Sequence, residues 1–268
     1  MSAFQHYAAA TALAGLMSLL ACGTIPAGQP GAVPSPSPVA STPAPAASTT
    51  APAALTSGAA PAPSSMTRAP GHPLLRLGAH GAAVKTLQRR LIALRYYDVA
   101  TADGVFGPGT YHSVIAFQKV QRLARDGVVG PATWARLARP RIPAPRYRMA
   151  TASLEVNLAR QVLYYIRGGV IRRILDTSTG RAGLPTPTGR FRIYWRYSNG
   201  WQPGPLGSMY RPNYFYRGYA VHGMTSVPAY PASHGCVRIT VRSMDHMRSM
   251  DRMWSSLFVG MPVGIYQS

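Results

Sequence analysis

The sequence predicts two folded domains of different class, a small helical domain followed by a mainly-β domain, behind a long unfolded segment. Between residues 84 and 94, apolar side chains recur three and four positions apart, which is the period of a helix. Beyond residue 150 the period falls to two, as in strands. Residues 25–65 are almost entirely Pro, Ala, Ser, Thr and Gly, which cannot bury enough apolar surface to offset the entropy of ordering.

Charge is distributed very unevenly between the two signs. The 268 residues include 28 Lys plus Arg against 7 Asp plus Glu, for a net charge of +21. Such a balance indicates an anionic partner rather than a fold. Because an export signal is present and no nucleic-acid module is recognisable, we expect no nucleic acid but an anionic cell wall or envelope surface.

The N-terminal region reads as a targeting segment. Residues 8–21 form an apolar run that is too short to span a bilayer but has the length of a signal-peptide core. Leu19-Leu20-Ala21-Cys22 resembles a lipobox, so we expect a signal peptide at 1–21, lipidation of Cys22 and a disordered tether at 22–70. These features predict export to the periplasm or cell envelope and a lipid anchor in the membrane. No Lys or Arg precedes Arg68, so the usual positive n-region is absent. An ordinary secretory peptide with an incidental Cys22 remains the alternative.

The helical domain is expected at 71–138. Its first helix holds an apolar stripe, and two further helices are expected to begin at Gly107-Pro108 and Gly130-Pro131, since proline favours the first turn. Two octets, 103–110 and 126–133, share the pattern Asp-Gly-Val-x-Gly-Pro-x-Thr, which reads as a turn followed by a helix start. The first stripe consists of Val84, Leu87, Leu91 and Leu94.

These octets, with the helix that precedes them, resemble the small three-helix peptidoglycan-binding domain of many wall enzymes. The resemblance spans the whole segment and implies peptidoglycan as a partner. A generic helical bundle is the alternative, which the doubled octet disfavours.

The second half of the chain reads as a mainly-β domain at 151–268, behind a Pro- and Arg-rich linker at 139–150. We expect a further strand at 190–196 that ends at the Asn-Gly turn signal, then a long irregular loop at 198–218 that walls a substrate groove. The aromatic residues of that loop, Tyr210, Tyr214, Phe215 and Tyr216, could equally be core. The remaining expected elements are strands at 154–158, 161–166, 170–175 and 262–266, and a helix at 241–256 with Met244, Met247 and Met250 on its core face.

The hexapeptide Ser233-His234-Gly235-Cys236-Val237-Arg238 holds the expected chemistry. Cys236 is interpreted as a nucleophile, because flanking by Ser, His and Gly is too polar for a buried structural thiol and two histidines stand near it. His222 and His234 could each convert a thiol with a pKa of about 8.5 into a thiolate near neutral pH. Gly235 leaves room for an incoming carbonyl, and we expect the N–H groups of Gly235 and Cys236 to form an oxyanion hole.

This hexapeptide, preceded by Tyr219-Ala220-Val221-His222-Gly223, resembles the active-site signature of the L,D-transpeptidases, the YkuD-type catalytic domain of bacterial cell-wall enzymes. The resemblance implies a β-sandwich-like domain and a cysteine acyltransferase that acts on peptidoglycan stem peptides. It also implies that His222 is the base. Since no carboxylate is near in sequence, the Gly223 carbonyl is expected to orient that imidazole.

The other residues of the motif are assigned to support and binding. His234 is expected to stabilise the loop or polarise the substrate. Arg238 offers a planar fork for a stem carboxylate, and Ser233 and Tyr219 are expected beside it in the binding site.

Three alternatives stay open. His222, His234 and Cys236 could bind zinc, but neither histidine has a neighbouring Glu as general base, so we expect no metal and no cofactor. Water as acceptor would make the protein an L,D-carboxypeptidase. A decayed site would leave a non-catalytic wall-anchoring lipoprotein.

Overall fold

The computed structural model describes residues 72–96, 98, 101–147, 149, 152–249 and 257–268, all within one compact unit. The predicted signal peptide at 1–21, Cys22 and the tether at 22–70 lie outside these residues. Among the described residues, no helix has both the length and the apolar character needed to cross a membrane.

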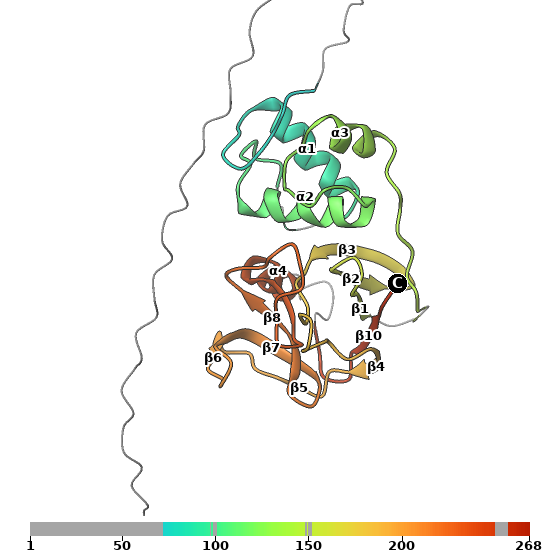
Figure 1. Cartoon of the computed structure of the whole chain (residues 1–268), viewed down its shortest axis with the longest axis vertical. Coiled ribbons are helices and arrows are strands. Elements are labelled where there is room, and N and C mark those ends of the chain that lie inside the picture. Colours follow the sequence, from blue (N-terminus) through green and yellow to red (C-terminus); the bar gives the residue numbers. More distant parts are fainter. Residues whose placement is uncertain (1–71, 97, 99–100, 148, 150–151, 250–256) are drawn as a thin grey trace, which may run out of the picture. The chain divides into compact units, whose positions relative to one another are not determined.

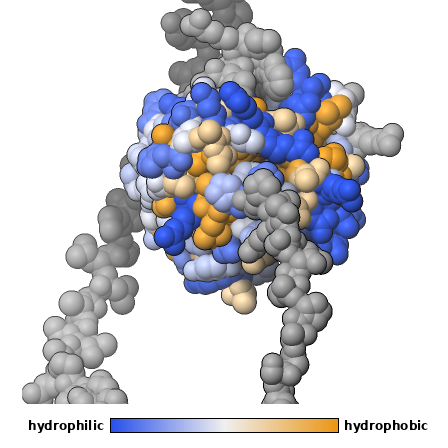
Figure 2. Space-filling model, turned by 90° about the horizontal axis from the view of Figure 1, so that it is seen from above, coloured by the Kyte–Doolittle hydropathy of each residue, from blue (hydrophilic) through white to orange (hydrophobic). Residues whose placement is uncertain are grey.

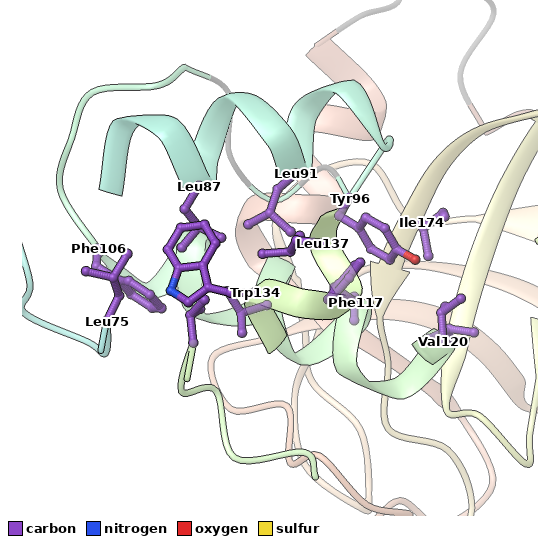
Figure 3. Packing of buried hydrophobic residues seen from close by; sticks show 14 of the residues in the cluster. Leu75, Leu87, Leu91, Tyr96, Phe106, Phe117, Val120, Trp134, Leu137 and Ile174 are labelled. Atoms are coloured by element: carbon purple, nitrogen blue, oxygen red, sulfur yellow. The ribbon is translucent and has the colours of Figure 1, made fainter. Parts of the chain in front are cut away.

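The N-terminal domain is helical (Figure 1). Its helices are α1 (Ala82–Ala93), α2 (Pro108–Gln121) and α3 (Pro131–Ala138). Pro108 and Pro131 occupy first-turn positions, as predicted, because a missing N–H costs nothing where no carbonyl is available. The faces that meet bury Leu87, Leu91, Phe106, Phe117 and Trp134 (Figure 3).

The repeated octets each wrap around one buried glutamine. The Gln88 amide N–H₂ donates to the Asp103 carboxylate at 2.7 Å and to the Thr110 hydroxyl at 3.0 Å, and Gln88 Oε1 accepts the Gly104 N–H. In the second octet Gln118 makes the same contacts to Asp126, Thr133 and Gly127. The Asp and Thr side chains of the pattern thus satisfy a buried amide at each turn together with a backbone N–H of the Gly, and the positive φ of Gly104 and Gly127 favours glycine there.

The C-terminal domain contains two mixed β-sheets. The strands are β1 (Ser153–Asn157), β2 (Val162–Arg167), β3 (Val170–Asp176), β4 (Gly189–Arg192), β5 (Trp195–Arg196), β6 (Trp201–Gln202), β7 (Met209–Tyr216), β8 (Tyr219–Met224), β9 (Val237–Thr240) and β10 (Pro262–Tyr266), and α4 (Val241–Ser249) follows β9. The first sheet has the strand order β3-β2-β1-β10-β4, with β1 and β10 parallel. The second sheet has the order β5-β7-β8-β9, with β8 and β9 parallel and β6 paired to β7.

One core lies between these sheets. Leu154 and Val263 of the first sheet pack in the same cluster as Val221, Val237 and Ile239 of the second. Met244 of α4 is fully buried there, as predicted for the first of the three methionines.

Two predictions about the middle of this domain are wrong. The single strand expected at 190–196 is two strands, because the chain passes from one sheet to the other. The Ile193 N–H donates to the carbonyl of Met261, which directly precedes β10 of the first sheet. The Tyr194 N–H donates to the carbonyl of Tyr214 in β7 of the second sheet. The loop expected at 198–218 contains β6 and all of β7. Shifts of register within β7, with Arg211 at φ 47°, break the alternation by which a strand is recognised in sequence.

The helical domain packs on the outer face of the first sheet. Tyr164 and Ile174 belong to the same apolar cluster as Phe117, and the Ile174 N–H donates to the Arg95 carbonyl at 2.8 Å (Figure 3). On the face that Figure 2 shows, apolar residues gather near the middle and hydrophilic residues lie around them.

Candidate active site

The parallel strands β8 and β9 place three chemically active side chains on one face. Val221 lies opposite Val237, and His222 lies opposite Arg238. Because side chains alternate along a strand, the two valines enter the core while His222 and Arg238 face the other way. Cys236 precedes β9 two positions before Arg238. All three line one pocket of about 520 Å³.

The His222 imidazole is buried and held by its own strand. Its Nδ1 lies 3.2 Å from the Gly223 carbonyl oxygen, so a proton on Nδ1 leaves Nε2 as an acceptor. Burial lowers the pKa of His222 to about 4, against a smaller raising effect of the Gly223 hydrogen bond and with a further lowering by Arg238. The imidazole is therefore neutral near pH 7 and can accept a proton.

The Cys236 thiol is half-buried, and its environment favours the protonated form. Burial raises the pKa of Cys236, while a hydrogen bond with the Ala220 backbone and the charge of Arg238 lower it by less. The direction of this pKa shift is opposite to the one needed for a resting thiolate near neutral pH. Desolvation penalises the charged form of both groups, so burial favours the thiol and the neutral imidazole in the resting site.

The cysteine loop is closed by Ser233. Its hydroxyl donates to the Cys236 carbonyl at 2.6 Å and accepts the Gly235 N–H at 3.0 Å. The Gly235 N–H, expected as an oxyanion donor, is thus directed at Ser233 in this structure, and its use as an oxyanion donor stays a prediction. Ser233 is buried and lies in the lining of the pocket, and both of these contacts of its hydroxyl are with the loop.

Gly235 is required by a tyrosine rather than by an incoming carbonyl. It adopts φ +113°, and a Cβ there would lie 2.2 Å from Cε1 of Tyr219. The Tyr219 ring therefore packs directly on the loop as well as lining the pocket.

Arg238 presents an unused donor. Its Nη1 donates to the Ala232 carbonyl at 3.4 Å, while its buried Nε has no hydrogen-bond partner among the described residues. A buried guanidinium N–H without a partner is costly, and a ligand carboxylate would satisfy it.

The segment after β6 forms one wall of the pocket. Residues 202–209 line it, within the range from which a groove wall was expected. Tyr214 of β7 lines it too and donates its hydroxyl to Gln202 at 3.0 Å. His234, half-buried, also faces this pocket.

Comparisons with known proteins agree with this arrangement. Residues 80–137 match the family described as putative peptidoglycan binding domain, and residues 151–263 match the L,D-transpeptidase catalytic domain. The crystal structure of the L,D-transpeptidase from Xylanimonas cellulosilytica is 38% identical, covers 74% of this chain and 98% of that chain, and has a TM-score of 0.65. This chain belongs to the L,D-transpeptidase family.

Two curated relatives match this L,D-transpeptidase family member over shorter stretches. An uncharacterised protein from Kitasatospora aureofaciens is 45% identical over 65 residues, which are 24% of this chain and 55% of that protein. A probable N-acetylmuramoyl-L-alanine amidase from Bacillus licheniformis is 39% identical over 61 residues, which are 22% of this chain and 17% of the amidase. The chain thus spans about half or less of these curated relatives.

Sequence reasoning missed two parts of this L,D-transpeptidase site. Tyr214 belongs to β7, whose irregular register hides the strand in the sequence, so the sequence does not separate a pocket role from a core role. Thr186, whose hydroxyl donates to the Gly235 carbonyl at 2.8 Å, lies in a loop where no sequence pattern indicates that contact. In the described part of the chain, no three His, Cys, Asp or Glu side chains are grouped so as to hold a metal ion.

Proposed function

We propose that this protein is a cysteine acyltransferase that acts on peptidoglycan stem peptides, an L,D-transpeptidase in activity as well as in family. The observation that supports the proposal most strongly is the grouping of Cys236, His222 and Arg238 around one pocket. A nucleophile, a base with an orienting carbonyl and a cationic donor are the parts that an acyl transfer requires.

The first half-reaction forms a thioester. Arg238 binds a stem carboxylate, and Cys236 Sγ attacks the carbonyl carbon of an L-to-D peptide bond while its proton passes to Nε2 of His222. The Cys236 N–H is our candidate oxyanion donor. When the tetrahedral intermediate collapses, the C–N bond breaks and the leaving D-residue amine takes the proton from His222.

The second half-reaction reverses these steps with a new amine. The acceptor amine attacks the thioester carbonyl and gives a proton to His222, a new amide forms, and the sulfur leaves and regains that proton. A neutral resting pair suits this sequence, because no buried charge must be maintained between turnovers.

Other residues of the site have supporting roles in this proposal. The Gly223 carbonyl fixes the tautomer of His222. Tyr219 packs against Gly235 and holds the loop, and His234 forms part of the substrate wall.

The remaining chain would bring this site to its substrate. We propose that the helical domain binds peptidoglycan, that the protein is exported to the periplasm or cell envelope, and that Cys22 is lipidated and anchors it to a membrane. The net charge of +21 favours an anionic wall. Nucleic acid is not a proposed partner.

The test is incubation of the full chain with a defined tetrapeptide stem and an amine acceptor, with products read by mass spectrometry. We expect a product in which the terminal D-residue is replaced by the acceptor, and none with the variant Cys236→Ser. Trimmed stem without acceptor would identify an L,D-carboxypeptidase. Unchanged stem would leave a wall-anchoring lipoprotein.

A further inference from the structure

A lysine of the helical domain is buried against the catalytic domain. Lys119 lies on α2, and its side chain has no exposed surface. Its ammonium donates to the Asp176 carboxylate, to the Thr177 carbonyl at 2.9 Å and to the Gln161 carbonyl at 3.1 Å. Three donors meet three acceptors, so this buried charge is fully satisfied.

The choice of lysine at this place is unusual for this chain. Of the 28 basic residues, only Lys85 and Lys119 are lysines. Lys85 is exposed, whereas Lys119 meets acceptors that converge on one point. A compact ammonium can serve such acceptors, but a planar guanidinium fork cannot.

The segment that Lys119 holds runs alongside the cysteine loop. The Thr177 hydroxyl donates to the Arg238 carbonyl at 2.5 Å. Ser178 and Arg238 exchange two backbone hydrogen bonds, at 2.9 and 3.1 Å. On the other side of the cysteine, the Thr179 carbonyl accepts the Ser233 N–H at 3.0 Å.

A second route joins Lys119 to the same segment. The Gln161 side-chain amide donates to the Thr179 hydroxyl at 2.6 Å and accepts the Thr179 N–H at 2.8 Å. Because Lys119 binds the Gln161 carbonyl, its ammonium contacts the segment at Thr177 directly and at Thr179 through Gln161.

The helical domain also holds the far end of the catalytic strand. Asp98, which is buried, accepts hydrogen bonds from Thr240 at 2.9 Å and from Ser243 at 2.7 Å. Thr240 is the last residue of β9, so both ends of the strand that follows Cys236 are tied to the helical domain.

From these contacts we propose that Lys119 is a positioning residue for the Cys236 loop, and that the helical domain is a structural part of the active site rather than only a wall anchor. A test of this proposal by enzyme activity rests on the proposed acyl transfer. A test by the rate of Cys236 alkylation is independent of that function.

The test uses three variants of the full chain. Lys119→Met alone would leave Asp176 buried without its main partner, so Lys119→Met is combined with Asp176→Asn, which removes both charges and keeps the volumes. Thr177→Val is the second variant, since it deletes one hydroxyl at constant shape. Lys85→Met, an exposed lysine of the same domain, is the control.

Two measurements are made on each variant, the turnover number for stem transfer and the rate of Cys236 alkylation against pH. Burial is the main cause of the raised pKa of Cys236, so a loosened loop gains solvent and its thiol pKa falls. We expect the double variant to alkylate several-fold faster at pH 8 and to turn over at least about 10-fold more slowly, because misplacement of a nucleophile costs rate. Thr177→Val should shift both in the same directions by less, and Lys85→Met should match the parent.

Two outcomes would overturn the proposal. One is a parent-like alkylation profile in a folded double variant. If the double variant does not fold, the second outcome is a Thr177→Val variant whose alkylation profile and turnover both match the parent, and this also overturns the proposal. A parent that alkylates normally but transfers nothing would instead reject the acyl-transfer function, and the alkylation profiles alone would then decide the role of Lys119.

Discussion

The Nδ1 atom of His222 lies 3.2 Å from the carbonyl oxygen of Gly223, the next residue in the chain. The imidazole is thus oriented by its own strand and needs no carboxylate. An orienting carboxylate would stabilise the imidazolium, whereas this neutral carbonyl in a buried site leaves the imidazole a weak base.

The acid limb of the pH profile should therefore lie unusually low. Because burial lowers the pKa of His222 to about 4, the base is lost only when the pH falls through about 4. We expect kcat/KM for stem transfer to rise from pH 3 to 5 and to show no inflection near 6.5. The measurement is kcat/KM against pH on samples whose fold is checked at each pH. An inflection near 6.5 would mean that His222 is solvated in the working enzyme.

The two histidines should differ in what they do to the thiol. His222→Ala should lower transfer by roughly 10²- to 10⁴-fold, the usual worth of a general base, and His234→Ala by much less. Because burial is the main influence on the pKa of Cys236, neither histidine should hold that pKa at the low value of an activated thiolate. Neither substitution should therefore raise the ionisation midpoint of the thiol. Alkylation rates against pH check this for the parent and both variants. A parent midpoint well below 8 that rises in one variant would assign a thiolate-forming role to the histidine removed.

A methyl group at Gly235 should be poorly tolerated. Its Cβ would lie 2.2 Å from the Tyr219 ring at φ +113°, which combines a steric clash with backbone strain. We expect Gly235→Ala to destabilise the fold by about 2–4 kcal/mol, more than the strain alone. Gly78→Ala is the matched control, because Gly78 also has a positive φ but no atom within 4 Å of its Cβ position. Equal losses of thermal stability in both variants would remove Tyr219 as the cause.

Chelators should leave transfer unchanged, and a thiol alkylator should abolish it. The proposed chemistry uses the thiol, the imidazole, backbone donors and the Arg238 guanidinium, and it requires no metal ion. The measurement is stem transfer after dialysis against a chelator, with and without added zinc. Loss that zinc restores would favour a metallopeptidase site at His222, His234 and Cys236.

The active side chains could be predicted because they lie close together in sequence. Cys236 and Arg238 share one short motif, and the alternation of β8 and β9 brings His222 to the same face. The pKa values could not be predicted in this way. Whether His222 and Cys236 are charged depends on how deeply the fold buries them, which no local motif indicates.

The helical domain shows the same limit. The repeated octets predicted a turn and a helix start, but not the buried amides at their centres, because Gln88 and Gln118 lie at unequal distances before their octets. No sequence pattern around Lys119 indicates that it is buried and hydrogen-bonded, because its three acceptors belong to the other domain. The apolar cluster of the helical domain likewise includes Tyr164 and Ile174 of the other domain, which no pattern within the helical segment indicates.

The acyl-enzyme itself provides the most direct measurement. The full chain is mixed briefly with a tetrapeptide stem without an amine acceptor, then quenched in acid, and its intact mass and peptide map are recorded. We predict a mass increase equal to the stem without its terminal D-residue, located on Cys236 and absent from Cys236→Ser. An increase that persists in Cys236→Ser, or active transfer with no thioester on Cys236, would contradict the assignment of the nucleophile.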